Sequence, residues 1–345
     1  MSGRRLGHTR QVLRRMFTRV VLSAPSPPVP PPLPEGRILE LPGVGETFVR
    51  VHLPRGPVSA DAPTLMLLHG WTASADLQWF TAYKHLGASY PFVAIDHRGH
   101  GRGIRSEEPF TLEAAADDAA AAIRALGIKN VIAVGYSMGG PIAVLLWQRH
   151  RDLVKGLVLC ATALEWSGTR AERLGWRAFA RAEGLMRSRL SRRLARRTIA
   201  WFARENPAIL PWTPWLGAEL RRGDPTAYVE AGRALSQYDA RPFAHEVDVP
   251  TAIVLTTMDQ LVGPAKQRVL AASTRAHIIE LEGDHLVNLA DGERFAVAVR
   301  AGVDAVVASR SVGLIGGVEP TFEALNGVRE PVEMLGEIVD GDHVG

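Results

Sequence analysis

The alternation of two residue patterns is the feature that most constrains the fold of this chain. From residue 36 to about residue 310, short apolar runs alternate with stretches that repeat apolar residues at the helical period. Several runs are apolar throughout, as expected of strands buried on both faces of a sheet. This alternation predicts an α/β fold: a doubly wound, mostly parallel sheet with helices on both faces. The expected strands cover residues 37–41, 48–53, 63–69, 92–96, 131–136, 154–161, 251–256 and 276–281, and the expected helices cover 75–86, 112–126, 141–150, 264–272 and 294–309.

One segment, residues 164–245, interrupts the alternation. It contains helical and loop patterns without a strand-like run, and it holds five of the eight tryptophans. We interpret it as a helical cap inserted between two strands of the sheet. A chain of 345 residues is long enough to bury a sizeable core beside such an insertion. The predicted organisation is a basic, proline-rich arm at 1–36, an α/β core at 37–163 and 246–312, the helical cap at 164–245, and an acidic tail at 313–345.

The two ends of the chain carry opposite charge. Residues 1–37 hold seven arginines against one glutamate, whereas the last 35 residues hold one arginine against seven carboxylates. Seven prolines lie between residues 25 and 34, and such a run favours polyproline II, so we interpret 23–35 as a linker. For residues 4–22 the sequence favours a disordered or loosely docked arm. It leaves open a helix on an anionic membrane surface and, least favoured, an export signal.

Composition excludes several classes of protein and site. The single cysteine, Cys160, cannot form a disulfide within the chain and rules out a metal site built from several cysteines. No run of about 18 apolar residues occurs, so no transmembrane helix is expected. The arginines at 187–197 follow a helical spacing typical of a solvated face, and we expect no nucleic-acid partner. The expected location is cytoplasmic, with peripheral contact at a membrane surface as the variant, and the sequence makes no prediction of the oligomeric state.

The motif Gly135-Tyr136-Ser137-Met138-Gly139 is the strongest chemical signal in the sequence. It matches G-x-S-x-G and lies between an expected buried strand and an expected helix. A sharp turn there strains the backbone at the serine and needs flanking glycines, because Cβ atoms would collide. We therefore predict that Ser137 is a nucleophile raised above the edge of the sheet. The amide of Met138, at the helix N-terminus, is expected to face the negative charge that develops in the reaction.

A second hydrogen-bond donor is expected at His69-Gly70-Trp71, which ends another apolar run. Gly70 permits a kink in the backbone, so the amide of Trp71 can point toward the serine. Two such donors are needed to hold a tetrahedral oxyanion. The side chain of His69 is expected to have a structural role.

A serine nucleophile needs a base, and the base needs an acid that orients it. In a sheet of this topology the expected chain order is Ser, then Asp or Glu, then His. Asp259 and His285 follow the last two expected strands, where α/β sheets place reactive groups. We predict that His285 takes the proton of Ser137 and that Asp259 fixes the tautomer of His285. Glu165 and Asp284 are rival acids, and Asp284 is disfavoured because it adjoins His285 in sequence.

The turn Asp96-His97-Arg98-Gly99-His100-Gly101 also follows an expected strand. We interpret it as structural, with Asp96 and Arg98 tying neighbouring loops together. His97 and His100 are metal-ligand types, but no further ligands cluster with them in the sequence. We therefore expect neither a metal nor a cofactor.

These motifs together make the chain similar to the α/β-hydrolase superfamily over about residues 40–310. The resemblance implies Ser137 as nucleophile, His285 as base and Asp259 as acid, with the amides of Trp71 and Met138 as oxyanion donors. It implies that residues 164–245 correspond to the family's lid. Relatives with an aspartate nucleophile, the epoxide hydrolases and haloalkane dehalogenases, are excluded because residue 137 is serine. The motifs that carry the resemblance are HGW (69–71), DHRGHG (96–101), GYSMGG (135–140), MDQLV (258–262) and GDHLV (283–287).

The expected function is a serine-dependent hydrolase that cleaves an ester or thioester through an acyl-enzyme. The tryptophans of the cap favour an apolar pocket for a small-molecule acyl substrate, and the competing interpretation is that they form the core of the cap itself. The same triad is also compatible with a carbon–carbon bond hydrolase, an acyltransferase or a perhydrolase. An alternative of another class is a non-catalytic ligand-binding or membrane-surface module in which Ser137 is idle.

Overall fold

A computed structural model of the chain describes residues 28–52, 62–181 and 209–315. The basic segment at 4–22, residues 23–27 of the proline-rich linker, the arginines at 187–197 and the acidic tail beyond residue 315 lie outside the described residues. Within the part described, no helix is long and apolar enough to cross a membrane. The membrane-surface helix that the sequence leaves open for residues 4–22 stays an untested alternative.

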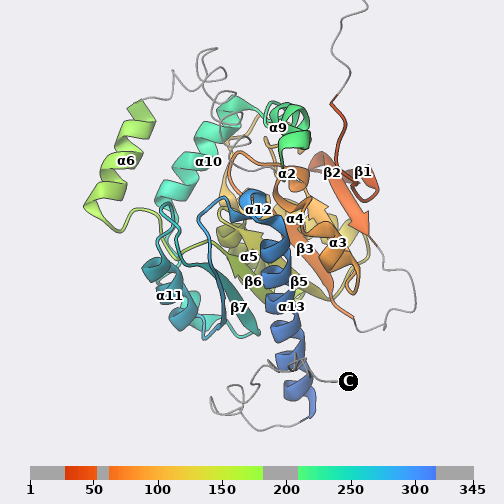
Figure 1. Cartoon of the computed structure of the whole chain (residues 1–345), viewed down its shortest axis with the longest axis vertical. Coiled ribbons are helices and arrows are strands. Elements are labelled where there is room, and N and C mark those ends of the chain that lie inside the picture. The colour runs from red at the N-terminus through yellow and green to blue at the C-terminus, as the bar shows by residue number, and fades with distance from the viewer. Residues whose placement is uncertain (1–27, 53–61, 182–208, 316–345) are drawn as a thin grey trace, which may run out of the picture.

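An eight-stranded sheet forms the centre of the molecule, in the order β1-β2-β4-β3-β5-β6-β7-β8 (Figure 1). Antiparallel pairing joins β1 to β2 and β2 to β4, and the remaining pairs are parallel. The predicted mostly parallel sheet is confirmed. The strands are β1 (Gly36–Leu41), β2 (Gly45–His52), β3 (Thr64–Leu68), β4 (Phe92–Ile95), β5 (Val131–Tyr136), β6 (Val154–Cys160), β7 (Thr251–Thr256) and β8 (His277–Leu281).

Helices cover both faces of this sheet, as a doubly wound fold requires. On one face, α4 (Leu112–Ala125), α5 (Gly139–Arg149) and α11 (Pro264–Ser273) share an apolar cluster with the strands. On the other face, a second apolar cluster contains residues of α2 (Ala75–Trp79), α3 (Tyr83–Gly87) and α13 (Gly292–Ile315). The strands between these layers are covered on both sides, which explains their continuous apolar runs.

The single helix expected at 75–86 is two short helices, α2 and α3. Between them the amide of Ala82 donates to the carbonyl of Trp79 at 2.9 Å, a tighter turn than that of an α-helix. The ring of Trp79 stacks on Phe295, and the ring of Tyr83 lies flat on Phe92. The break thus gives two aromatic side chains separate places in the core.

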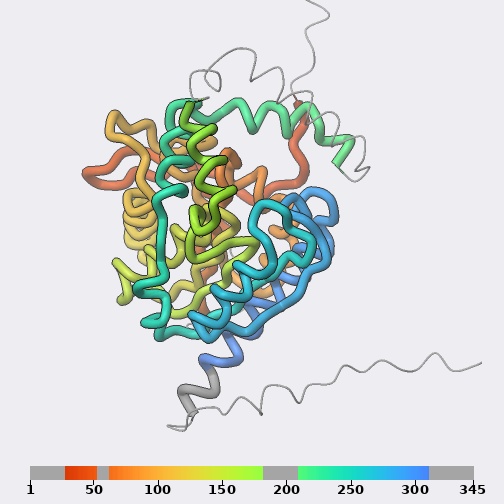
Figure 2. Tube along the Cα trace, turned by 90° about the vertical axis from the view of Figure 1, so that its left-hand side faces the viewer, coloured from red at the N-terminus to blue at the C-terminus, as the bar shows by residue number. Residues whose placement is uncertain are grey.

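The segment between β6 and β7 is helical where it is described. It leaves and rejoins the core at one place, because Glu165 and Asp239 form an antiparallel bridge. Figure 1 shows α6 at the periphery, with α10 between it and the body of the molecule, and in Figure 2 α6 is the yellow-green helix at the front. Treating residues 164–245 as a separate cap stays a prediction, and we use "cap helices" below for its described elements. These are α6 (Arg170–Arg181), η1 (Leu210–Trp212), α9 (Thr213–Glu219) and α10 (Pro225–Gln237), followed by η2 (Ala244–Glu246). The last helix before α13 is the short α12 (Val287–Ala290).

Candidate active site

Ser137 lies between β5 and α5 with its backbone in the left-handed region, at φ +52°. A residue with a side chain seldom adopts this conformation, which costs about 1–2 kcal/mol. Hydrogen bonds hold the residue there: its amide donates to Cys160 O at 2.9 Å, and its carbonyl accepts from the Thr162 hydroxyl at 2.9 Å. The strain that the motif predicts at the serine is therefore present.

Two glycines make this turn feasible. A Cβ on Gly135 would lie 2.1 Å from Gly139 O, and a Cβ on Gly139 would lie 2.1 Å from Leu68 O. Both distances are far inside van der Waals contact, so a larger residue would displace the backbone. The second contact also brings the start of α5 against the end of β3, next to the loop that carries Gly70 and Trp71.

The loop after β8 brings His285 to the serine. Its Nε2 lies 2.9 Å from Ser137 Oγ, and its Nδ1 lies 2.8 Å from Asp259 Oδ2. The hydroxyl of Tyr136 donates to the carbonyl of His285 at 2.8 Å, which holds the backbone of the histidine beside the serine turn. The three predicted side chains are thus joined by one continuous line of hydrogen bonds.

Asp259 is buried and surrounded by donors. Its Oδ1 accepts from two backbone amides of its own loop at 2.8 Å each, and its Oδ2 accepts from the Thr256 hydroxyl at 2.9 Å. Burial by itself would raise the pKa of Asp259, but the bond from His285 and these donors hold that pKa below its usual value. An ionised carboxylate only accepts hydrogen bonds, so Nδ1 of His285 carries the hydrogen and Nε2 is left to accept from Ser137.

The two rival acids have other partners. Glu165 pairs with Lys266 of α11 at 2.9 Å, and Asp284 accepts from the amide of Leu286 at 2.8 Å. Among the residues that the structure describes, neither is bonded to His285. Asp259 is the one of the three candidate acids that contacts the histidine.

The peptide between Gly70 and Trp71 lies beside the serine. A Cβ on Gly70 would lie 3.4 Å from Ser137 Cβ, an ordinary van der Waals contact. The carbonyl of this peptide accepts from His69 Nδ1 at 2.8 Å, and the amide of Gly70 donates to Gln78 Oε1 at 3.3 Å. Because the N–H and C=O of a trans peptide point in opposite directions, the bond to Gly70 O helps to set the direction of the Trp71 N–H.

The amides of Trp71 and Met138 are the two predicted oxyanion donors. Met138 is the N-cap of α5, a position whose neighbouring amides have no partner within the helix. Within the described ranges, neither the Trp71 amide nor the Met138 amide donates to another group of the protein. Both are therefore available to an acceptor on a ligand.

His69 is buried, and both of its ring nitrogens are used. Nε2 accepts from the amide of His97 at 3.0 Å, so Nδ1 carries the hydrogen that is donated to Gly70 O. Burial lowers the pKa of His69 to about 4, which keeps the ring neutral at neutral pH. These contacts agree with the structural role predicted for this side chain.

The turn at 96–101 ties neighbouring elements together, as predicted. Asp96 accepts from two backbone amides at 2.7 Å each, and Arg98 forms two bonds of 2.7 Å to a carboxylate of α4. The buried rings of His97 and His100 lie 4.1 and 5.5 Å from the ring of His69. In the described part of the chain, no group of three His, Cys, Asp or Glu residues is placed to hold a metal ion.

Three supporting residues were missed by the sequence analysis. Tyr136, Thr162 and Thr256 hold, respectively, the backbone of His285, the serine turn and the carboxylate of Asp259. Each lies at the carboxyl end of a strand or within two residues of it. That position is the one sequence signal that points to them.

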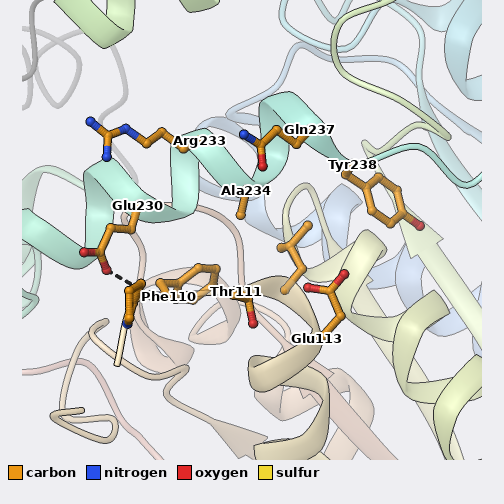
Figure 3. Close-up of a pocket in the computed structure, with 10 residues that line it drawn as sticks. Phe110, Thr111, Glu113, Glu230, Arg233, Ala234, Gln237 and Tyr238 are labelled. Carbon is orange, nitrogen blue, oxygen red and sulfur yellow. Dashed lines mark hydrogen bonds between the residues drawn. The ribbon is translucent and has the colours of Figure 1, made fainter. Parts of the chain in front are cut away.

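A cavity of about 340 Å³ lies apart from this site, between α10 and the start of α4 (Figure 3). The carboxylate of Glu230 lies in the wall of this cavity and accepts from the amide of Phe110 at 2.9 Å. Neither Ser137 nor His285 lines it. Its lining is Pro109, Phe110, Thr111, Leu112, Glu113, Glu230, Arg233, Ala234, Gln237 and Tyr238.

Comparison with known proteins identifies the family. A model of the alpha/beta hydrolase fold matches residues 63–291. The chain is 28% identical over 266 residues to the pimeloyl-[acyl-carrier protein] methyl ester esterase of Neisseria meningitidis serogroup A, covering 74% of this chain and 81% of that protein. It is 23% identical over 247 residues to 3-oxoadipate enol-lactonase 2 of Acinetobacter baylyi, covering 70% of this chain and 89% of that protein.

Among solved structures, the enol-lactonase of Burkholderia xenovorans LB400 has the same fold. It aligns with a TM-score of 0.66 at 23% identity, covering 78% of this chain and all (100%) of that chain. The family match spans most of the sheet and the candidate site. The chain therefore belongs to the α/β-hydrolase fold family and is a hydrolytic enzyme of that family.

Proposed function

We propose that this protein is a serine esterase that cleaves a carboxylic ester, or the related thioester, through an acyl-enzyme on Ser137. The observation that carries the proposal is the line of hydrogen bonds from Ser137 through His285 to Asp259. A nucleophile, a base, an orienting acid and two oxyanion donors form the set of groups that acyl transfer needs. The amides of Trp71 and Met138 are the proposed donors.

In the first half-reaction, Nε2 of His285 takes the proton of Ser137 while Oγ attacks the carbonyl carbon of the substrate. The carbonyl oxygen becomes an oxyanion, which the two amides stabilise. Collapse of this intermediate breaks the bond to the alcohol or thiol, which leaves with the proton from His285. In the second half-reaction, His285 takes a proton from water as the water oxygen attacks the acyl carbon, which forms a second oxyanion. Collapse of this intermediate breaks the bond to Ser137 Oγ, which recovers the proton from His285, and the carboxylic acid leaves.

Both proposed donors are backbone groups, so the side chains of Trp71 and Met138 do not supply them. One such donor contributes about 3–4 kcal/mol to transition-state stabilisation. The direction of each amide matters more than the residue that carries it. The bond from His69 to Gly70 O and the start of α5 hold these amides from the side of the core.

The surroundings of the site support an apolar acyl group. The ring of Trp71 lies 6.0 Å from that of Trp176 and 5.3 Å from that of Phe179, both in α6. Leu261 and Leu286, next to Asp259 and His285 in the chain, are exposed by 71% and 42%. The relatives named above are a methyl ester esterase and an enol-lactonase, and both substrates are carboxylic esters.

A panel of p-nitrophenyl acetate, butyrate and decanoate tests the proposal. We expect a rapid burst of nitrophenol, stoichiometric with the protein, followed by slower turnover, and a preference for the longer acyl chains. The burst reports the acyl-enzyme directly. Turnover of all three esters at the rate of the Ser137→Ala variant would refute the proposal.

A further inference from the structure

We infer that Trp71 couples the cap helices to the oxyanion site. Its backbone offers the amide, while its side chain is held by α6 and α10, so the position of these helices sets the direction of the amide together with the core bond to Gly70 O. The inference rests on the proposed function and adds a positioning role for residues between β6 and β7. On this inference the cap helices help to hold an oxyanion donor in position.

The cap helices contact both the N–H group and the ring of the Trp71 indole. Its Nε1 donates to the carbonyl of Tyr228 in α10 at 2.7 Å. Its ring packs edge-on against Phe179 at 5.3 Å and lies 6.0 Å from Trp176, both in α6. Nε1 is the one hydrogen-bond donor of an indole, so the ring cannot shift relative to α10 without losing that bond.

Gly232 allows α10 to approach this ring closely. A Cβ on Gly232 would lie 2.8 Å from Trp71 Cζ2 and 2.6 Å from Phe179 Cζ. Glycine disfavours a helix interior, yet α10 carries one at the point of contact. The missing side chain is what lets the two cap helices enclose the indole.

The backbone after Trp71 is strained. Thr72 has φ +62°, and the amide of Ala73 donates to Gly70 O at 3.3 Å, which closes a tight turn. A β-branched residue in the left-handed region persists only where its surroundings force it. The core holds Gly70, whereas the hydrogen bond and ring contacts of the Trp71 side chain come from the cap helices. The strained turn is therefore held from both sides.

Displacement of the cap helices releases the indole and lets the turn relax, which swings the Trp71 amide away from the oxyanion position. The loss falls on the transition state, because the neutral carbonyl of a bound ester needs the donor less than the oxyanion does. The line from Ser137 to Asp259 stays intact, since its bonds come from β5, β7 and β8. Movement of the cap therefore changes kcat more than KM.

The variant Gly232→Ala tests this coupling, with Gly175→Ala as its matched control. A Cβ on Gly175, in α6, has no atom within 4 Å, so the same change there adds a methyl group to open space. We measure kcat and KM for p-nitrophenyl butyrate and the affinity for a trifluoromethyl ketone, which becomes an oxyanion when Ser137 adds to it. Gly232→Ala is expected to lower kcat and ketone affinity together by about tenfold or more, with KM nearly unchanged. Gly175→Ala should leave all three values unchanged.

Two further variants keep the test decisive if Gly232→Ala folds poorly. Trp71→Phe keeps an aromatic ring but loses the bond to Tyr228 O, and Phe179→Leu removes the edge contact from the half-buried face of α6. Thermal melting and stoichiometric fluorophosphonate labelling of Ser137 establish that each variant is folded with a reactive serine. The same joint loss of kcat and ketone affinity is expected from both.

Folded, labelled variants that keep wild-type kcat and ketone affinity would overturn the coupling. So would a rise in KM with kcat unchanged, because the cap would then only bind substrate. A wild-type protein that takes no label on Ser137 would instead overturn the proposed function, and the coupling with it. The two failures therefore have different signatures.

Discussion

The strand ends that carry Ser137, Asp259 and His285 are built differently from the helices that cover them. In α5, which follows the serine, residues 139–147 are all buried, and Asp259 is 1% exposed. In α6, by contrast, none of the described residues is buried. The reacting groups follow strands and a helix packed in the core, whereas α6 has the few buried contacts expected of a segment that opens locally.

Ion pairs attach α6 and α9 to the core, in addition to the contacts that Trp71 makes. Lys266 of α11 pairs with two glutamates, one before α6 and one within it, at 2.9 and 2.7 Å. At the other end, the buried Glu219 of α9 accepts from Ser74 Oγ at 3.2 Å and lies 3.7 Å from Arg102. Substitutions can therefore change the residues around Ser137 and the attachment of the cap helices separately.

The largest expected effect comes from removing the side chains of the hydrogen-bonded line from Ser137 to Asp259. Ser137→Ala and His285→Ala should each lower kcat by about 10⁶, and the double variant should be no worse, because the two groups act as a unit. Asp259→Asn should lower kcat by about 10⁴, because an amide in place of the carboxylate favours the wrong tautomer of His285. Steady-state kinetics on p-nitrophenyl butyrate measure these losses. Additive losses in the double variant would show that the residues act independently.

A matched pair of glycine substitutions compares the packing of the two regions. Gly139→Ala places a Cβ 2.1 Å from Leu68 O, so the free energy of unfolding should fall by about 3 kcal/mol or more. Gly175→Ala, on the exposed helix α6, should raise it by up to about 1 kcal/mol through helix propensity. Urea denaturation of both variants measures the difference. Equal midpoints would mean that the start of α5 is not packed against β3 as described.

Acid should destabilise the rigid side through its buried histidines. Burial lowers the pKa of His69 to about 4 and that of His100 to about 3, whereas an unfolded histidine takes up its proton near pH 6.5. Below about pH 6.5 the unfolded state binds more protons, so the free energy of unfolding falls with pH, by up to about 1.4 kcal/mol per pH unit for each residue. Neither residue contributes to this slope above that range.

The variant His100→Gln isolates one of these protons. Its free energy of unfolding should fall less steeply than that of the wild type between pH 6 and 5, by about one proton. The control His277→Gln changes an exposed histidine of β8 and should keep the wild-type slope. Urea midpoints at the two pH values measure the slopes. Identical slopes for wild type and His100→Gln would contradict the burial of a neutral ring at this position.

The smallest expected effect comes from a substitution that weakens only the attachment of α6 to the core. Lys266→Met removes the partner of Glu165 and Glu172, and because Lys266 is partly exposed the free energy of unfolding should fall by less than about 1 kcal/mol. Hydrogen exchange in α6 should nevertheless become faster, while exchange in β5 and α5 stays the same. Arg268→Met is the control, since Arg268 lies on the same helix but pairs with Glu280 of β8. Exchange in α6 that is equally slow in both variants would argue against this attachment.

The sequence alone predicted most of the fold and the members of the candidate site, because each leaves a local pattern. Buried strands are continuous apolar runs, and the turn at Ser137 needs glycines at fixed positions. The acid was harder, because chain order alone left Glu165 as a rival to Asp259. The pairing of Glu165 with Lys266 depends on how α11 lies beside the start of the cap, and no local sequence pattern encodes that arrangement.

Contacts between distant segments were beyond prediction for the same reason. The bond from Trp71 to Tyr228 spans 157 residues of sequence, and neither residue carries a signal for it. The break between α2 and α3 was missed because the helical period of the apolar residues continues across it. In each case the outcome depends on packing in three dimensions, which overrides the local pattern.

The central claim is that His285 makes the hydroxyl of Ser137 a nucleophile, and covalent labelling tests it most directly. The protein is treated with a fluorophosphonate, and the adduct is mapped by peptide mass spectrometry. We expect one adduct per chain, on Ser137, with no label on folded Ser137→Ala and much slower labelling of folded His285→Ala. Equal labelling of wild type and Ser137→Ala, or no labelling of the wild type, would contradict it.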